Sequence, residues 1–245
     1  MPLHFLVETS GAARPGDAVT LTGPEAHHAA VVRRVRVGEE VTVGDGRGAW
    51  LTGDCESASA KEVVVRVTGR DDVPAASPRL VLVQALAKGD RDELAVQAAT
   101  ELGVDEIVPW QAARSVSRWD AAKAAKGTAR WAAIAREAAK QAHRAWLPEV
   151  SSLATTNDLV RRAAASVVLV LEPTAGVPLS RTTLAADDDR DILLIVGPEG
   201  GIAPEELERF AEAGATAVRL GPTVLRTSTA GPAALAVVSG ILGRW

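Results

Sequence analysis

Apolar segments separated by helical segments fill the chain from residue 80 to its end, and this alternation limits the fold more than any other feature. The apolar segments are RLVLVQAL, DEIVPW, SVVLVLEP, DILLIVGPEGG and AVRLGP. Helices are expected at about 90–102, at about 128–145, from about 204, and in the small-residue C-terminal stretch. Strands of this apolar kind need a parallel sheet covered by helices on both faces. The sequence therefore predicts an α/β domain.

Residues 1–72 show a different pattern, with short alternating runs such as EEVTVGDG and KEVVVRVTG. Asp45-Gly46 is typical of a hairpin turn between two such runs, which predicts a small β-barrel or sandwich. The segment PEAHHAAVVRRVR at 24–36 has helical spacing and predicts a helix with a basic tip. Charge, prolines and small residues at 73–79 indicate a linker. We therefore expect one domain at 1–72 and a second at 80–245.

The composition limits the compartment and the partners. A chain of 245 residues with 47% hydrophobic content can bury a substantial core. The formal net charge of −4 argues against a wholly basic surface but allows a local basic face. The single cysteine, Cys55, permits no internal disulfide, and no Cys/His cluster has zinc-ligand spacing, so no metal is expected. Neither a signal peptide nor an apolar run of roughly 20 residues occurs, so we expect a cytoplasmic protein without a membrane span.

Three apolar strands of the second domain end in a proline turn. The turns are Glu172-Pro173, Gly197-Pro198 and Gly221-Pro222. Ligands of an open parallel sheet bind outside the carboxyl ends of its strands, and glycine lets a backbone approach a ligand closely. Any one of these turns can simply end a strand. Together they favour a shared ligand pocket.

The charges around this pocket restrict its ligand. The chain lacks both the Gly-x-x-x-x-Gly-Lys-Ser/Thr and the Gly-x-Gly-x-x-Gly pattern of phosphate loops. Glu199 lies in the central turn, and Glu205, Glu206 and Glu208 follow it, where they also suit a helix N-terminus. These carboxylates disfavour a pyrophosphate. A flat, adenine-like ligand with positive charge fits better, and S-adenosylmethionine meets that description.

The order of the motifs resembles one known family. IVGPEGG, followed by LGPTVLRTSTA, is similar to the paired signature of the SPOUT methyltransferases and specifically of the RsmE family. AKGDRDELAVQAATELGVDEIVPW and RWAAIAREAAKQAHR extend the likeness upstream, and HHAAVVRRVRVGEEV extends it into the first domain. The resemblance therefore covers nearly the whole chain.

The resemblance implies a function and a fold that the spacing of residues does not show. The family methylates N3 of a uracil in bacterial 16S ribosomal RNA, with S-adenosylmethionine as methyl donor. Its members have an N-terminal PUA-like barrel that helps to bind RNA and a C-terminal α/β domain with a deep trefoil knot around the cofactor. They act as homodimers. By this resemblance we expect 16S rRNA or the small ribosomal subunit as the partner, and the sequence does not distinguish between the two.

The resemblance also implies which residues bind the cofactor, chiefly through backbone hydrogen bonds to adenine and ribose. They are Leu171, Glu172, Gly197, Pro198, Glu199, Gly200, Gly201, Leu220, Gly221, Val224, Leu225 and Thr227. The family pattern usually has glutamate where this chain has Ser228, so an indispensable role for that glutamate does not transfer. Gly231-Pro232 also departs from a regular helix and is expected to delay or kink the helix start.

Methylation of uracil N3 requires loss of the N3 proton and an in-line approach to the methyl group. We expect Arg226 to stabilise the negative charge that develops on the uracil carbonyls, although a structural pairing with Glu199 or a carbonyl group is an equal alternative. Glu199 and Glu172 are candidates for the general base, and transfer of the proton to water is the other route. The sequence does not choose among them.

A basic segment is expected to bind RNA. Residues 110–146 hold eight lysines and arginines against only Asp120 and Glu137, and Trp119 and Trp131 lie among them. Such a run is often only a solvated helix face, and Trp131 can equally be a core residue, but the near absence of acids favours phosphate contacts with base stacking. The predicted RNA-binding residues are Arg33, Arg34, Lys88, Arg91, Arg114, Arg118, Lys140 and Arg144. His27 and His28 lack a third ligand nearby and are not expected to bind a metal.

Three other functions stay open. A Rossmann-type nucleotide enzyme requires a phosphate-loop motif after an early strand, which VQALAKGDRDE does not provide. A non-catalytic RNA-binding protein, or a different SPOUT RNA methyltransferase, is the alternative to the RsmE activity. The C-terminal small-residue helix is expected to form either the dimer surface or a face buried within one subunit.

Overall fold

The computed structural model describes residues 2–185 and 188–245, and the chain divides into two compact units. The first unit comprises Met1–Ala75 with Ala139–Leu147, and the second comprises Ala76–Ala138 with Pro148–Trp245. The division differs from the predicted linear domains, because residues 139–147 belong to the first unit. Gly48 N donates a hydrogen bond to Ala145 O (3.1 Å), and Leu147 N donates to Gly46 O (3.0 Å).

The first unit is built on a five-stranded sheet in the order β1-β3-β4-β5-β2. The strands are β1 (Leu3–Leu6), β2 (Ala18–Thr22), β3 (Glu40–Gly44), β4 (Ala49–Ala58) and β5 (Glu62–Asp72), and a 3-10 helix, η1 (Glu8–Ala12), follows β1. β1 pairs with β3 in parallel, and the other pairs are antiparallel. Alternate apolar residues of these strands form a separate core that includes Phe5, Leu21 and Val41.

The predicted helix at 24–36 is shorter than expected. Helix α1 (Gly23–His27) continues into a π-helical turn, η2 (His28–Val32), and helical structure ends there. Arg34 has a φ of 57°, a left-handed conformation that breaks a helix. The prediction of a basic helix tip is therefore wrong, and Arg33, Arg34 and Arg36 lie in the turn after the helix, exposed to solvent.

The second unit contains a seven-stranded sheet in the order β10-β12-β9-β11-β6-β7-β8. Its strands are β6 (Leu80–Ala85), β7 (Glu106–Trp110), β8 (Glu149–Val150), β9 (Val167–Leu171), β10 (Val177–Pro178), β11 (Ile192–Val196) and β12 (Thr216–Arg219). Every neighbouring pair is parallel. The predicted parallel α/β sheet is thus confirmed. The two-residue strands β8 and β10 were not predicted, because neither lies in an apolar run.

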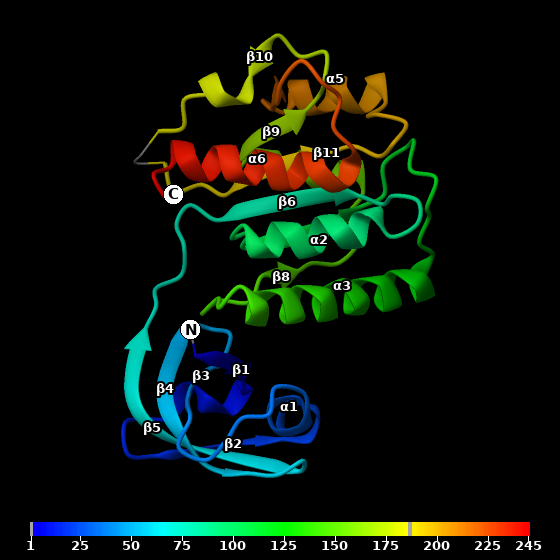
Figure 1. The fold of residues 1–245 in the computed structure, drawn as a ribbon. Helices are drawn as coiled ribbons and strands as arrows, with labels where there is room; N and C mark the ends of the chain where they lie inside the picture. The colour runs from blue at the N-terminus through cyan, green and yellow to red at the C-terminus, as the bar shows by residue number, and fades with distance from the viewer. Residues whose placement is uncertain (1, 186–187) are drawn as a thin grey trace. The chain divides into compact units, whose positions relative to one another are not determined.

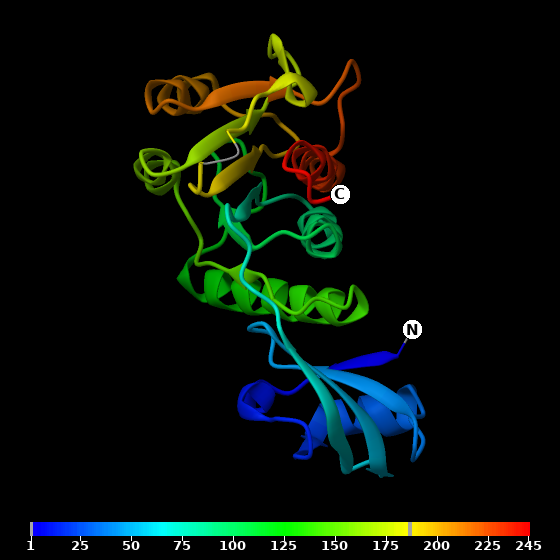
Figure 2. The same cartoon turned by 90° about the vertical axis from the view of Figure 1, so that its left-hand side faces the viewer.

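Helices cover both faces of this sheet. They are α2 (Arg91–Glu101), α3 (Ala121–Gln141), α4 (Thr156–Ala163), α5 (Pro204–Glu212) and α6 (Thr227–Ile241), with a 3-10 turn, η3 (Leu179–Arg181). Figures 1 and 2 show α2 and α6 side by side against one face, with α4 and α5 on the other. Successive residues of one strand serve opposite faces: Leu82 packs on the α2 and α6 side, and Val83 packs with Phe210 of α5.

Two helix boundaries differ from the predicted ones. Helix α3 begins before 128, because Asp120 accepts a hydrogen bond from Lys123 N (2.9 Å) and caps its first turn, and it ends before His143, whose φ is 53°. Helix α6 begins at Thr227, so Gly231-Pro232 does not delay its start. A Cβ at Gly231 would lie 2.7 Å from Leu82 Cδ1, so glycine is needed there for the close approach of α6 to β6.

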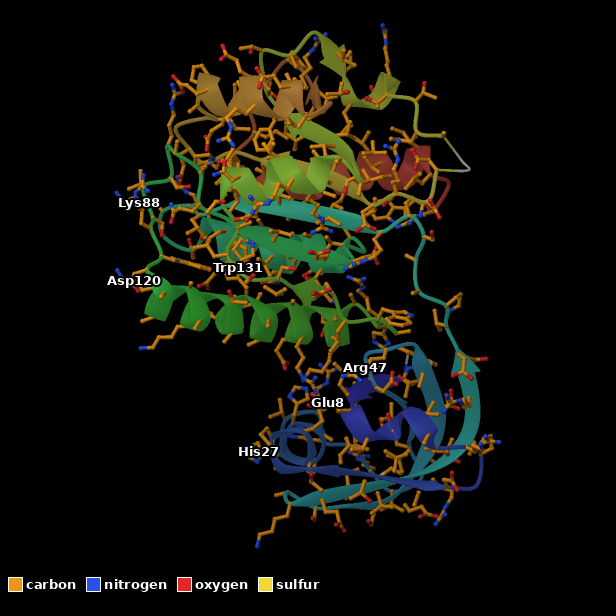
Figure 3. The ribbon with its side chains drawn as sticks, turned by 180° about the vertical axis from the view of Figure 1, so that it is seen from behind. Glu8, His27, Arg47, Lys88, Asp120 and Trp131 are labelled. Carbon is orange, nitrogen blue, oxygen red and sulfur yellow. The ribbon has the colours of Figure 1, made fainter. Side chains whose placement is uncertain are left out.

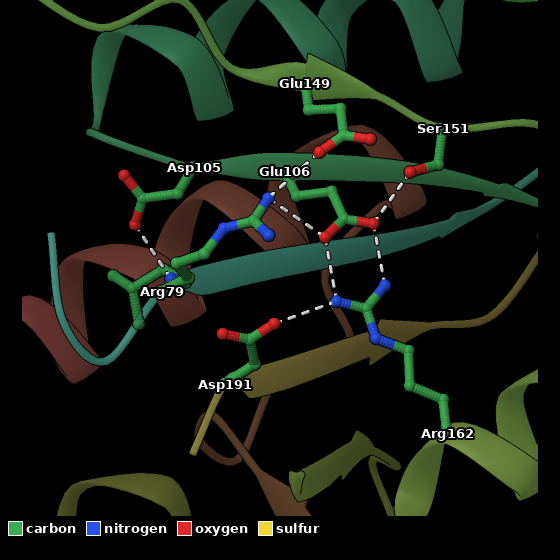
Figure 4. A network of polar contacts seen from close by, with 8 residues as sticks. Arg79, Asp105, Glu106, Glu149, Ser151, Arg162 and Asp191 are labelled. Atoms are coloured by element: carbon green, nitrogen blue, oxygen red, sulfur yellow. Dashed lines mark hydrogen bonds and ion pairs between the residues drawn. The ribbon is translucent and has the colours of Figure 1, made fainter. Parts of the chain in front are cut away.

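A charged network closes the amino-terminal edge of the sheet (Figure 4). Glu106 at the start of β7 is buried and accepts hydrogen bonds from Arg162 Nη1 and Nη2, both at 2.7 Å, and from Ser151 Oγ at 2.7 Å. Arg79 Nη2 lies 3.1 Å from the same carboxylate. Arg162 also contacts Asp191 at 3.0 Å. Burial opposes ionisation of Glu106, but the bonds from Arg162 and Ser151 and the charge of Arg79 outweigh it and lower its pKa.

Candidate active site

The three proline-turn strand ends meet, as predicted, around one pocket. β9, β11 and β12 are neighbours in the sheet, so their carboxyl ends lie at the same edge. A cavity of about 390 Å³ opens there. Its lining comes from the ends of these strands, the turns after them and the first turn of α6, with Arg91 from α2 added. A pocket of this size and position suits a small ligand.

Nearly all residues predicted to bind the cofactor line this pocket. They are Leu171, Glu172, Gly197, Pro198, Glu199, Gly201, Leu220, Gly221, Val224, Leu225 and Thr227, and Arg226 lies among them. Gly200 is absent from the lining. The lining also contains residues that are not among the predicted cofactor-binding residues: Arg91, Pro173, Val196, Ile202, Val218, Arg219, Thr223 and Ala230. Most of these residues are apolar or stand next to a predicted residue in the sequence. Including one or two more positions on each side of every predicted strand end would have predicted them.

The glycines of the central turn differ in what they do. A Cβ at Gly197 would lie 2.6 Å from Ile202 Cγ1, so only glycine lets the turn fold tightly after β11. Gly201 has a φ of 72°, in the left-handed region that favours glycine. At Gly200 a Cβ would meet only ordinary contacts, at 3.5 Å from Arg114 Cβ. The backbone freedom that shapes the pocket therefore resides in Gly197 and Gly201.

Glu199 is held by the segment that follows β6. Its Oε1 accepts hydrogen bonds from Lys88 N (3.0 Å) and from Arg91 Nη1 (2.9 Å). Partial burial opposes ionisation most strongly, but bonds from its own backbone N–H, from Lys88 N and from Arg91 outweigh it and lower the pKa of Glu199. A carboxylate that is paired with an arginine and has a lowered pKa is a weak proton acceptor.

Arg226 is exposed at the pocket and immediately precedes α6. Glu199 pairs with Arg91, so the predicted alternative of an Arg226–Glu199 pair is not what the structure has. In the part of the chain that the structure describes, no hydrogen bond or ion pair engages the Arg226 side chain. Its neighbour Thr227 is buried and donates a hydrogen bond from Oγ1 to Gly197 O (2.9 Å), which ties the start of α6 to the central turn.

The residues predicted to bind RNA fall into two groups. Arg33, Arg34, Lys88 and Arg118 are exposed, although Arg118 Nη2 also donates to Ala113 O (3.1 Å). The others already serve the fold. Lys140 is buried and pairs with Glu25 at 3.2 Å, Arg91 pairs with Glu199, and Arg144 is half-buried. Arg114 is exposed, but its Nη1 donates to Gly200 O (3.2 Å) in the turn after β11.

Trp119 and Trp131, the two tryptophans considered for base stacking, differ in their surroundings. Trp131 is buried in the core under α3 and points from the helix towards the sheet, whereas Lys88 projects from the loop after β6 (Figure 3). Stacking of Trp131 on a base is therefore ruled out, and its alternative role as a core residue is correct. Trp119 is half-buried, packs edge-on against Trp131 with ring centroids 5.5 Å apart, and lines a second hollow beside α3.

The described residues contain neither a cluster of metal ligands nor a helix able to span a membrane. There, no three or more His, Cys, Asp or Glu residues gather so as to hold a metal ion. Across residues 2–185 and 188–245, helices that combine the length and hydropathy needed to cross a membrane are absent.

Both units match family models. Residues 75–239 match a model described as an RNA methyltransferase domain, and residues 21–68 match one described as an RNA methyltransferase PUA domain. The match of the second unit, which holds the strand-end pocket, and the PUA match of the first unit place the chain in the class of RNA methyltransferases.

Individual relatives narrow this class. The chain is 46% identical to ribosomal RNA small subunit methyltransferase E from Mycobacterium bovis over 94% of its own length and 89% of the relative. Two solved structures each cover 98% of both chains with a TM-score of 0.85: a Legionella pneumophila methyltransferase with bound SAM, at 31% identity, and a Neisseria gonorrhoeae ribosomal RNA small subunit methyltransferase E bound to S-adenosyl methionine, at 27%. The chain belongs to the ribosomal RNA small subunit methyltransferase E family.

Proposed function

We propose that this protein transfers a methyl group from S-adenosylmethionine to N3 of a uracil in 16S ribosomal RNA. One observation carries the proposal: three neighbouring strands end around a single cavity that is rich in backbone groups, with Arg226 exposed at it. Membership of the family and the two relatives solved with the cofactor support the choice of methyl donor.

The residues present fit that cofactor. Gly197, Gly201 and Gly221 lie at the cavity, while Leu220 and Leu225 supply apolar surface for a flat ring. The cavity lining holds two carboxylates, Glu172 and Glu199, and three arginines, Arg91, Arg219 and Arg226, so the choice of cofactor rests on the backbone groups and on the relatives rather than on charge. When bound, S-adenosylmethionine supplies an electrophilic methyl group for a nucleophilic nitrogen.

Arg226 is the residue that we assign to the uracil. Its guanidinium is exposed and has no side-chain partner among the described residues, so its donors are available for the carbonyl oxygens that flank N3. Negative charge builds on those oxygens as the N3 proton leaves, and a fixed cation stabilises it. Ser228 stands where the family usually has glutamate, and it is half-buried two residues after Arg226. This chain therefore has no carboxylate at that position beside Arg226.

For Glu199 we propose a role in shaping the pocket. Its carboxylate joins the turn after β11 to Lys88 and Arg91, and its lowered pKa makes it a poor acceptor for the N3 proton. The proton then passes to Glu172 or to water. Glu172 Oε1 accepts a hydrogen bond from Thr174 Oγ1 (2.9 Å) at the rim of the same pocket.

We propose that the exposed cations Arg33, Arg34, Lys88 and Arg118 contact RNA phosphates. Exposed guanidinium and ammonium groups neutralise phosphates and release counterions. Lys140 is excluded from this group because it is buried against Glu25, and Arg91 and Arg114 act on the turn after β11. Of Trp119 and Trp131, we propose that Trp119 stacks on a base, because Trp131 is buried.

Further parts of the proposal rest on the family resemblance. These are a homodimer, a cytoplasmic site of action on the ribosomal subunit, and a trefoil knot in the C-terminal part of the chain. The side of α6 that packs on α2 and on the sheet is buried within one chain, but Ala233, Ala236 and Val237 are half-exposed and leave small-residue surface for a second copy. Light scattering of the purified protein measures the oligomeric state.

Two measurements test the proposed function. Calorimetry should detect binding of S-adenosylmethionine and S-adenosylhomocysteine to the purified chain. Incubation with S-adenosylmethionine and 16S rRNA or 30S subunits that lack the modification should then yield 3-methyluridine, detected by mass spectrometry. RNA binding without any cofactor binding would instead identify a non-catalytic RNA-binding protein, and methylation of another atom would identify a different RNA methyltransferase.

A further inference from the structure

Gln84 is a fully buried polar residue beside the proposed active site that has no role in the cofactor or RNA contacts described above. It lies near the carboxyl end of β6, next to β11 in the sheet, and its exposed fraction is 0%. Gln84 Nε2 donates hydrogen bonds to Thr227 Oγ1 (2.8 Å) and to Ala85 O (3.1 Å). Gln84 Oε1 is buried and has no hydrogen-bond partner among the described residues.

The contact to Thr227 continues to the pocket. Thr227 Oγ1 accepts from Gln84 and donates to Gly197 O at 2.9 Å. One chain of hydrogen bonds therefore joins β6, the start of α6 and the turn after β11. Its direction is fixed, since only the amide N–H₂ of glutamine can donate to the hydroxyl while that hydroxyl donates to the carbonyl.

This chain of hydrogen bonds fixes two groups of the proposed active site relative to each other. Gly197 belongs to the turn that lines the cavity, and Arg226 directly precedes Thr227. The Arg226 side chain has no partner of its own in the described residues, so the backbone of its neighbour is what places it. Small displacements of a catalytic group cost rate even when binding is kept.

An apolar side chain of similar length would avoid the cost of burying an unpaired amide oxygen, so packing alone does not account for glutamine at this position. We propose that Gln84 is a positioning residue for methyl transfer, acting through Thr227 to set Arg226 against the cofactor turn at Gly197. This inference rests on the proposed methyltransferase function.

The test compares kcat and the KM for 16S rRNA in Gln84→Met, Thr227→Val and the double variant. Each single variant should lower kcat about tenfold with KM unchanged, as expected when one buried hydrogen bond that orients a reacting group is lost. Because both substitutions break the same chain of hydrogen bonds, the double variant should be no slower than the slower single variant. Thr227→Ser keeps the hydroxyl and should restore kcat to within about threefold of wild type.

A matched control separates positioning from stability. Thr100 is also fully buried, and its Oγ1 donates to Val96 O (2.8 Å) in α2, so Thr100→Val removes a buried hydroxyl bond that lies within one helix and away from the pocket. It should lower the melting temperature and leave kcat unchanged. If Gln84→Met does not fold, the kcat of Thr227→Val is compared with that of Thr227→Ser and of Thr100→Val. A kcat lowered in Thr227→Val alone supports positioning.

The outcomes are distinguishable. If the wild-type chain neither binds S-adenosylmethionine nor methylates rRNA, the proposed function fails and this inference fails with it. If the wild type is active and Gln84→Met or Thr227→Val keeps the wild-type kcat at a lowered melting temperature, only the inference is overturned, because Gln84 is then a structural residue. Strict additivity of the two substitutions also overturns it.

Discussion

The two edges of the parallel sheet differ in how a charged side chain is paired and buried. At the amino-terminal edge, Glu106 is buried and bound by Arg162, Arg79 and Ser151 (Figure 4). At the carboxyl edge, Arg226 stays exposed without a side-chain partner among the described residues, next to an open cavity. Strand direction explains the difference, since loops and helix starts that can hold a ligand converge outside the carboxyl ends. The amino-terminal edge stabilises the fold, and the carboxyl edge leaves Arg226 available for chemistry although Glu199 is paired there.

This contrast predicts that substitutions at the two edges will affect different quantities. The largest effect is expected at the amino-terminal edge for Glu106→Gln. Removing the carboxylate leaves Arg162 without its main partner, and breaking a buried pair costs about 3–5 kcal/mol of unfolding free energy. Urea unfolding measures the loss. Glu149→Gln is the control, because Glu149 contacts the same Arg79 but its side chain is 64% exposed, and it should cost at most about 1 kcal/mol. Equal costs for the two would contradict the contrast.

The pH dependence of stability should follow Glu106 as well. Its pKa is lowered in the folded protein, so the folded state binds its proton less tightly than the unfolded chain does. The stabilisation is complete above the ordinary value of 4.5 and disappears as the pH falls through the folded pKa. Between these values the wild type should lose stability more steeply than Glu106→Gln. Parallel stability curves for the two proteins would show that Glu106 is not the linked group.

At the carboxyl edge, Arg226→Ala should mainly reduce turnover. Removing a preorganised group that stabilises developing charge costs about 10²–10³ in kcat. The melting temperature and the affinity for S-adenosylhomocysteine should stay close to wild type, because Arg226 is exposed and has no partner in the described chain. Arg161→Ala is a matched control, since this arginine is 71% exposed on α4. Equal losses of turnover and cofactor affinity would instead assign Arg226 to cofactor binding.

Glu199→Gln distinguishes a pocket-shaping role from a catalytic one. The amide keeps an acceptor for Lys88 N but loses the ion pair with Arg91, so kcat should fall less than tenfold, compared with the 10²–10⁴ that general-base catalysis typically contributes. The shape of the pH–rate profile should not change. A loss of 10² or more, with disappearance of an acidic limb from that profile, would make Glu199 the base.

The smallest effects are expected for the exposed cations. Lys88→Ala should weaken RNA binding and reduce the slope of log affinity against log salt by about one. Lys140→Ala is the informative comparison, because this buried lysine pairs with Glu25, so its loss should destabilise the first unit and leave the salt slope unchanged. Filter binding at several salt concentrations and thermal melting give both quantities. A reduced slope of log affinity against log salt for Lys140→Ala would show that Lys140 contacts RNA.

Features that repeat along the chain could be predicted from the sequence. The alternation of apolar strands and helices gave the parallel sheet, because burial on both faces demands residues such as Leu82 and Val83 in succession. The shared pocket followed from three prolines placed after such strands, since parallel strands end at one edge. The predicted cofactor residues other than Gly200 line that pocket for the same reason, and their contacts with the cofactor stay a prediction.

Features that depend on pairing across the fold could not be predicted. Glu199 and Arg91 are 108 positions apart, so nothing local indicates that they form an ion pair. Lys140 looked like part of a basic face, but Glu25 meets it only after folding. Residues 139–147 looked like the end of a helix, yet their backbone pairs with the turn after β3. Gln84 stands in an apolar strand, and its contact with Thr227 appears only in three dimensions.

The most direct test of the central claim is the amount of 3-methyluridine in 16S rRNA from a strain that lacks this gene and carries a plasmid copy. We expect mass spectrometry to find the modified nucleoside with the wild-type copy and to find almost none with Arg226→Ala at equal protein level. Full modification in the strain without any copy, or with Arg226→Ala, would contradict the assignment of this strand-end pocket as the site of methyl transfer.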